Sequence, residues 1–343
     1  MPSSKRNLLA ASGQDQPYTG DIAVVHDISP RISVYPWDSG FGTKYANPSL
    51  EPDNDGYGVA FSPDGADIAV AHPTFPYIAA YPWSSGFGTR YSDPSTEPTG
   101  TGRSVTFSPD GSDIAVGHSS SPYISVYPWS SGFGSKYANP STLPAGSGYS
   151  VAFSPDGSDI AVGHFGSPYI SVYPWSSGFG TKYSDPNGSS LPTGTGNGVA
   201  FSPDGADIAV AHPNSPRITA YPWSSGFGSK YSDPFPIPTG IGRSVAFSPD
   251  GSDIAVGHSS SPYISVYQWS SGFGGRYSSP SGSSLPTGSG YGVAFTPDGA
   301  DIAVSHFGSP YISVYPWSSG FGTKYANPST LPTGTGFGVA FSP

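Results

Sequence analysis

Tryptophan recurs through this sequence at nearly constant intervals, and that period constrains the fold more than any other feature. Successive Trp residues are 46 or 48 residues apart, and the His residues keep the same intervals. The two series are Trp37, Trp83, Trp129, Trp175, Trp223, Trp269 and Trp317, and His26, His72, His118, His164, His212, His258 and His306. Self-similarity at a fixed period indicates units that pack against their neighbours. Residues 21–343 are therefore seven copies of one unit, and residues 1–20 are expected to be an N-terminal tail.

Each copy predicts four β-strands. In the fourth copy, residues 150–154 and 159–164 alternate bulky with small side chains, and residues 169–173 are β-branched or aromatic at most positions. A Pro-Asp-Gly turn joins the first two strands, because Pro presets one φ angle and Gly accepts a positive one. Residues 181–184 are expected to be a short fourth strand. Four strands in about 46 residues are typical of a propeller blade, so we predict an all-β, seven-bladed β-propeller of four-stranded antiparallel blades.

The two ends of the sequence complement each other. The first copy starts at a second strand, Asp21–His26, and the sequence stops after a first strand, Gly338–Pro343. We expect this C-terminal strand to complete the N-terminal blade and close the ring. Burial of Val339 and Phe341 should then contribute about 1.5–3 kcal/mol each. A rival first strand, Leu8–Ser12, lies further from its neighbour than the other first strands do, and we assign it to the tail.

The repeated sequence motif resembles that of a known family. Phe-Ser-Pro-Asp-Gly followed by Ile-Ala-Val and Tyr-Ile-Ser-Val-Tyr resembles WD40-type propeller repeats over residues 21–343. The chain departs from that pattern because Tyr35, Tyr81 and their counterparts replace its Trp, and Pro128 or Gln268 replaces its Asp. The family's hydrogen-bond network is therefore not carried over. The motif Tyr-Pro-Trp-Ser-Ser-Gly-Phe-Gly is also similar to repeat arrays in virion-associated proteins of tailed bacteriophages. This resemblance implies a location rather than an activity.

One position varies among copies whose surroundings hardly change. It lies two residues before the Val of each first strand and is occupied by Tyr57, Arg103, Tyr149, Asn197, Arg243, Tyr291 and Phe337. In a propeller this position falls at the mouth of the central channel, on the face that carries the connections between blades. Aromatic and Arg side chains are enriched in binding hot spots, so we expect this rim to bind a partner. Loop drift would produce similar variation.

The polar residues that repeat in every copy are expected to be structural. The His ring lies one strand away from the axis, with each His in a separate blade, whereas zinc needs ligands at about 2.0–2.1 Å from one ion. Pairs such as Asp156 and Asp159 are typical of turns, and their spacing is a weak pattern for calcium. We therefore predict no metal site and no cofactor.

Charge and composition exclude several classes of partner. The net charge is −10, with no basic stripe, which disfavours nucleic acid. No segment reaches the roughly 18 apolar residues of a membrane span, so we expect no membrane insertion. The chain has no Cys and no recognisable signal peptide, which excludes disulfides and gives no export signal.

The sequence favours a protein that is not an enzyme. Ser, His and Asp repeat identically in every copy, so no single nucleophile stands out with its own base and orienting acid. We predict a rigid binding or scaffold disc, either virion-associated or an adhesion module at the extracellular surface. It would bind a protein or glycan through the connection face and attach to a larger assembly; a cytoplasmic location is the alternative. A multivalent lectin with one aromatic site per blade is the second hypothesis. A hydrolase or lyase with a channel active site is the third, hinted at by Arg103 and Arg243.

Overall fold

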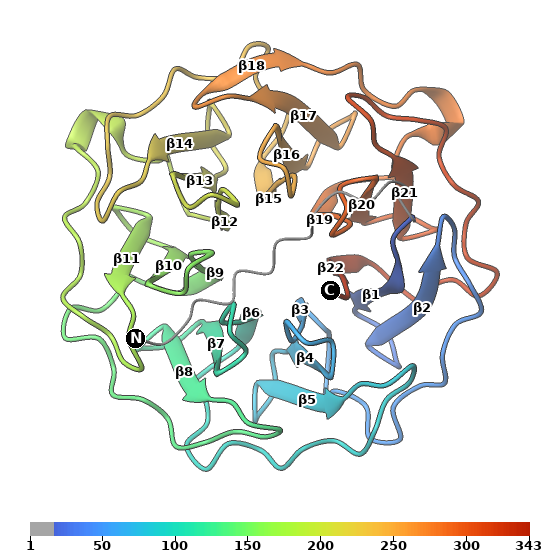
Figure 1. Cartoon of the computed structure of the whole chain (residues 1–343), viewed down its shortest axis with the longest axis horizontal. Helices are drawn as coiled ribbons and strands as arrows, with labels where there is room; N and C mark the ends of the chain where they lie inside the picture. The colour runs from blue at the N-terminus through green and yellow to red at the C-terminus, as the bar shows by residue number, and fades with distance from the viewer. Residues whose placement is uncertain (1–16) are drawn as a thin grey trace, which may run out of the picture.

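The chain forms seven antiparallel sheets arranged in a ring (Figure 1), around a central channel that residues of all seven blades line. The computed structural model describes residues 17–343, with only the backbone of Ser189. The fold is the predicted seven-bladed β-propeller. Residues 1–16, including most of the predicted tail and the rival strand Leu8–Ser12, lie outside the described residues.

The strands follow one order in every blade, from the channel outward. Blade 1 consists of β22 (Gly336–Phe341), β1 (Thr19–His26) and β2 (Ile32–Asp38). Blades 2 and 3 consist of β3 (Gly58–Phe61), β4 (Asp67–Ala71), β5 (Ile78–Pro82), β6 (Gly102–Phe107), β7 (Asp113–His118) and β8 (Ile124–Pro128). Blades 4 and 5 consist of β9 (Gly148–Phe153), β10 (Asp159–His164), β11 (Ile170–Pro174), β12 (Gly198–Phe201), β13 (Asp207–Ala211) and β14 (Ile218–Pro222). Blades 6 and 7 consist of β15 (Gly242–Phe247), β16 (Asp253–His258), β17 (Ile264–Trp269), β18 (Phe273–Arg276), β19 (Gly290–Phe295), β20 (Asp301–His306) and β21 (Ile312–Pro316). Short 3₁₀ turns, η1 (Gly188–Ser190) and η2 (Gly282–Ser284), lie in two of the connections.

The outermost strand is a regular strand only in blade 6, where β18 pairs with β17. In the other blades it is reduced to one isolated bridge between a Trp and a Phe, as at Trp37 and Phe41. One difference between blade 6 and the others lies one residue before the Trp. The carbonyl of Pro36 faces outward and accepts the Gly42 N–H at 2.8 Å, so an amide at position 36 would face outward too, but Pro has none. Blade 6 has Gln268 at this position, and its ladder continues.

Seven apolar cores lie between the blades rather than within them. Each core joins the bulky face of one blade to the next blade's opposite face, as where Val34 of blade 1 packs with Ile68 and Trp83 of blade 2. Bulky side chains face small ones because both faces of each sheet are covered at close-packed density. The seventh core joins blade 7 to blade 1 through Val314 and Trp37, so the core continues across the closure.

A ring of buried polar contacts also joins the blades. Every Trp side chain donates its Nε1–H to a carboxylate of the preceding blade at 2.8–3.0 Å, as Trp129 does to Asp67. In six blades the other oxygen of that carboxylate accepts a Tyr hydroxyl at 2.7–2.9 Å, as from Tyr91. The second Asp of each pair therefore links neighbouring blades. A buried carboxylate that accepts two such hydrogen bonds has a partner for each oxygen. Loss of one donor would leave a buried oxygen without a partner and would destabilise the folded protein.

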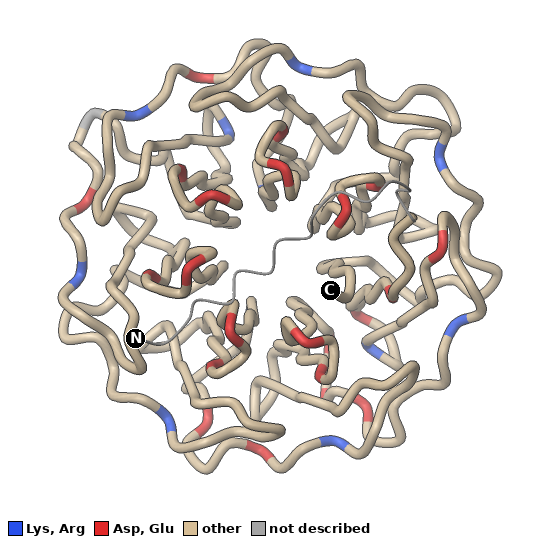
Figure 2. Tube along the Cα trace, viewed as in Figure 1, with Lys and Arg blue, Asp and Glu red and all other residues tan. Residues whose placement is uncertain are grey.

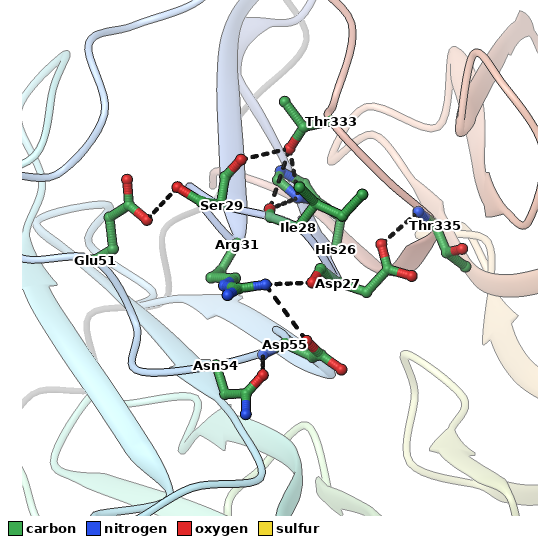
Figure 3. Close-up of polar contacts among 10 residues, drawn as sticks. All are labelled: His26, Asp27, Ile28, Ser29, Arg31, Glu51, Asn54, Asp55, Thr333 and Thr335. Carbon is green, nitrogen blue, oxygen red and sulfur yellow. Dashed lines mark hydrogen bonds and ion pairs between the residues drawn. The ribbon is translucent and has the colours of Figure 1, made fainter.

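The C-terminal strand closes the ring as predicted, since β22 pairs antiparallel with β1. Val339 and Phe341 are only half-buried, so each contributes less than full burial would give. Figure 3 shows further closing contacts on the connection face, where the Thr333 hydroxyl donates to the Ser29 carbonyl at 2.8 Å. The Thr335 N–H donates to Asp27 Oδ1 at 2.9 Å. The first blade is thus joined to the last by core, ladder and loop contacts.

Candidate functional site

One pocket is lined by the seven rim residues that vary among the copies. It has a volume of about 340 Å³ and lies at the mouth of the channel on the connection face. Its lining is Tyr57, Arg103, Tyr149, Asn197, Arg243, Tyr291 and Phe337. All seven side chains are half-buried. The fold brings these residues together because each stands at the start of the innermost strand of its blade.

In five of the seven blades the rim residue lies in a bulge of the innermost strand. In blade 3, Gly102 pairs with His118 and Ser104 with Gly117, which leaves Arg103 unpaired in a bulge of β6. The same shift occurs at the start of the innermost strand in blades 1, 4, 6 and 7. Bulges re-aim side chains and are common next to active sites. The preceding glycine is required, since a Cβ at Gly102 would lie 2.2 Å from the carbonyl oxygen of Tyr77.

Two arginines in the pocket stack on the neighbouring tyrosines. The guanidinium carbon of Arg103 lies 4.3 Å from the ring centroid of Tyr149, and that of Arg243 lies 4.3 Å from the ring centroid of Tyr291. Neither guanidinium forms an ion pair within residues 17–343. The buried Nε atoms of both arginines have no hydrogen-bond partner there. The stacks hold the two cations in place without an acidic partner.

The rest of the ring divides into an aromatic and a polar side. Phe337 packs edge-to-face on Tyr57 and on Tyr291, at centroid distances of 5.3 and 5.1 Å. On the other side, Asn197 Nδ2 donates to the Gly242 carbonyl at 2.8 Å. Burial, with the nearby Asp55 carboxylate, raises the pKa of Tyr57, so its hydroxyl is protonated at neutral pH and can donate. No Asp, Glu or His lines this pocket among the residues that the structure describes.

The His ring lies away from the pocket, buried in the blades. In six blades the His Nε2 lies 2.8–3.0 Å from a Ser or Thr hydroxyl of the adjacent strand, as His118 does from Ser125. His72 lacks this partner because Ala79 replaces the hydroxyl residue. Burial lowers the pKa of His72 and His118 to about 4, so both rings are neutral at pH 7.

The paired aspartates lie on the opposite face from the rim. The first of each pair organises its Ser-Pro-Asp-Gly turn, where Asp64 Oδ1 accepts the Ser62 hydroxyl at 2.6 Å and the Ala66 N–H at 3.0 Å. These bonds lower the pKa of Asp64. Figure 2 shows acidic residues on these inner turns, whereas the outer edge of the disc carries both acidic and basic residues. Clefts between neighbouring turns, of about 410 and 330 Å³, are lined by Asp, Ser, Pro and Trp.

Residues 17–343 include no helix of the length and apolar character needed to cross a membrane.

Similar proteins are found by structure alone. No protein-family model matches the chain, and no curated protein matches it by sequence. A solved structure provisionally named a 6-phosphogluconolactonase, from Bacteroides uniformis, is 15% identical with a TM-score of 0.70, covering 94% of this chain and 99% of its own. The periplasmic gluconolactonase of Pseudomonas aeruginosa is 17% identical with a TM-score of 0.70, covering 95% and 99%. Another protein provisionally named a 6-phosphogluconolactonase, from Bacteroides fragilis, is 12% identical with a TM-score of 0.67, covering 97% and 99%.

These comparisons correct the functional prediction. The similar structures are named as lactone-cleaving enzymes, which contradicts a non-enzymatic virion or adhesion disc. The lectin alternative gains no support either. The resemblance to WD40 repeats holds at the level of a propeller of repeated blades, and the comparisons support neither a WD40 assignment nor a phage link. At 12–17% identity the likeness itself shows the fold.

Proposed function

We propose that the channel-mouth pocket is the active site of a hydrolase that opens the lactone ring of a sugar acid. The observation that carries this proposal is the pair of stacked, unpaired guanidinium groups of Arg103 and Arg243 in a pocket lined otherwise by aromatic rings and one amide. The names of the structural neighbours supply the reaction class, by analogy of fold.

The pocket has the size and chemistry that a sugar acid requires. Its volume of about 340 Å³ is at the small end of the range for ligand sites. The aromatic rings of Tyr57 and Phe337 offer apolar surface to the C–H groups of a sugar, while Asn197 offers an amide oxygen to its hydroxyls. The unpaired guanidinium groups bind an oxyanion through charge-assisted hydrogen bonds.

Ring opening needs stabilised negative charge more than it needs a strong base. Water attacks the lactone carbonyl carbon, the carbonyl oxygen becomes an oxyanion, and the bond from that carbon to the ring oxygen then breaks. The ring oxygen takes up a proton, and the product is a hydroxy acid that ionises to a carboxylate. A guanidinium fixed beside the carbonyl oxygen stabilises the oxyanion, usually the largest single contribution to such catalysis. The protonated hydroxyl of Tyr57 is a further donor in the pocket.

The test is the rate of lactone hydrolysis, followed by acid release above the spontaneous background. We expect the protein to accelerate opening of 6-phosphogluconolactone or of gluconolactone. Replacing one oxyanion donor typically reduces the rate by about 100-fold or more, so we expect a loss of this size for Arg103→Gln or Arg243→Gln. The matched control is Arg217→Gln, because Arg217 lies on the same face but outside the pocket.

The outcomes separate clearly. Activity that falls in both pocket variants and not in Arg217→Gln supports the proposal. The absence of any acceleration by the unmodified protein, or equal losses in all three variants, would overturn it. Melting temperatures of the variants show that each loss is not due to unfolding.

A further inference from the structure

The channel-mouth ring contains an Arg–Tyr pair twice, each followed by a different third residue. Going round the ring, Arg103, Tyr149 and Asn197 are followed by Arg243, Tyr291 and Phe337, with Tyr57 completing the circle. The two Arg–Tyr stacks have the same geometry, with 4.3 Å from guanidinium carbon to ring centroid in each. The pocket therefore has two equivalent arginine sites for an anionic group rather than one.

The two Arg–Tyr stacks lie on opposite sides of the channel. Arg103 belongs to blade 3 and Arg243 to blade 6, so they are three blades apart in one direction and four in the other around a seven-bladed ring. Because the two arginines start from opposite sides of the ring, each can contact a different end of one ligand in the pocket. They suit one ligand that carries a negative charge at each end.

We propose that this site selects a lactone bearing a phosphate or carboxylate remote from its carbonyl, with one arginine on each end. This inference rests on the proposed function. One arginine binds the anionic group that the substrate already carries. The other faces the carbonyl oxygen, where the second negative charge appears only as the ring opens.

The arrangement matches the transition state and product better than the substrate. The lactone brings one anionic group, whereas the tetrahedral oxyanion and the hydroxy-acid product each have two. Interactions that strengthen as the charge develops accelerate the reaction, whereas equal binding of substrate and transition state does not. The same complementarity makes the two-charged product a tight ligand.

The residues that follow the two Arg–Tyr pairs differ, and this difference orients the ligand between the arginines. Phe337 closes an aromatic arc with Tyr57 and Tyr291 on one side. Asn197 holds the equivalent position on the other side, and its Oδ1 forms no hydrogen bond within residues 17–343. A sugar acid lying across the channel can place its C–H face on the arc and its hydroxyls toward Asn197. The ring thus distinguishes the faces of the ligand as well as its ends.

Calorimetry with three probes tests the proposal on the full chain. The probe 6-phosphogluconate has two anionic ends, glucose 6-phosphate has only the phosphate, and gluconate has only the carboxylate. Because a hydrogen bond to a charged group contributes about 10- to 100-fold in affinity, we expect the two-ended probe to bind tighter than either single-ended probe by this factor. Glucarate, which has a carboxylate at both ends, tests whether a carboxylate can replace the phosphate.

Arginine variants show whether the ligand contacts both arginine sites. Arg103→Gln and Arg243→Gln should each remove the advantage of 6-phosphogluconate and leave single-ended affinity within a few-fold. Arg103→Lys should recover part of it, since Lys retains the charge without the planar fork. Arg217→Gln is the matched control and should bind like the unmodified protein. Single-ended probes that bind as tightly as 6-phosphogluconate would overturn the inference, as would variants that keep its advantage.

The outcome is separable from that of the proposed function. If the protein opens gluconolactone as fast as 6-phosphogluconolactone, and both rates depend on the arginines, then hydrolysis stands and two-ended recognition is wrong. If 6-phosphogluconate binds with the predicted advantage but no lactone is opened faster, then the pocket recognises two anionic ends and the hydrolase proposal is wrong.

Discussion

The clearest physical prediction concerns the one histidine whose ring has no partner. Both ring nitrogens of His72 are buried and unbonded, because Ala79 replaces the hydroxyl residue present in the other blades. Burial lowers the pKa of His72 to about 4 from its usual 6.5. The unfolded chain therefore binds a proton at this residue more readily than the folded chain does. Its contribution to stability is complete above pH 6.5 and is lost as the pH falls toward 4.

The size of the effect follows from the two pKa values. For one histidine with these values, the free energy of unfolding falls by about 2 kcal/mol between pH 7 and pH 5. Unfolding entropy scales with length, so a chain of 343 residues loses about 1.4 °C of melting temperature per kcal/mol, or about 3 °C for this residue. Six of the histidines have a folded pKa of about 4, so the total loss is on the order of 10 kcal/mol.

The perturbation is His72→Leu, measured by thermal melting at pH 7 and pH 5. At pH 7 we expect little change, because an unbonded polar ring is replaced by an apolar side chain. Between pH 7 and pH 5 the variant should lose about 3 °C less than the unmodified protein. The matched control, His118→Leu, leaves the Ser125 hydroxyl without its partner. It should be less stable at pH 7 by about 1–2 kcal/mol and show the same reduced sensitivity to acid.

Equal loss of melting temperature in His72→Leu and in the unmodified protein would contradict this prediction. If His72→Leu and the unmodified protein lose the same number of degrees between pH 7 and pH 5, the buried ring does not resist protonation, and the acid sensitivity has another origin.

Three further predictions concern the ring and its outer edge. Deleting residues 338–343 removes the strand partner of β1 and should cost about 5 kcal/mol, or about 7 °C; an unchanged transition would mean that another segment fills the gap. Gln268→Pro should speed hydrogen exchange of Phe273–Arg276 with a change of only about 1 °C in melting temperature, and unchanged exchange would contradict the role assigned to the missing amide. Trp129→Phe removes the donor to Asp67 and should cost about 2 kcal/mol in chemical denaturation, and Trp37→Phe, whose Nε1–H bond spans the closure, should cost the same; a cheaper Trp37→Phe would mean a weaker closing interface.

The blade number and the rim could be predicted because equivalent positions in a closed ring lie at equal radius. Comparing copies singled out one variable position, and the fold places all seven of its side chains, Arg103 and Arg243 among them, around one pocket. The stacking of each arginine on the next tyrosine could not be predicted. It depends on the bulge that leaves Arg103 unpaired and turns it toward Tyr149.

The contacts between blades were beyond a strand-by-strand interpretation of the sequence. Asp67 was expected to serve its own turn, whereas it accepts bonds from Trp129 of the next blade and from Tyr91. The signal was present as a constant interval between these residue types in every copy, but pairing them requires the stagger of neighbouring sheets. Function was obscured for a related reason. Most positions are identical among the repeats, so the few positions that differ do not indicate a site in the sequence alone. They do so once the fold places their side chains around one pocket.

The most direct test of the channel-mouth site is a crystal structure of the protein with 6-phosphogluconate. The account predicts one molecule across the mouth of the channel, with its phosphate on one of Arg103 and Arg243 and its carboxylate on the other. A molecule bound in the clefts of the opposite face, or outside the ring of seven residues, would contradict it.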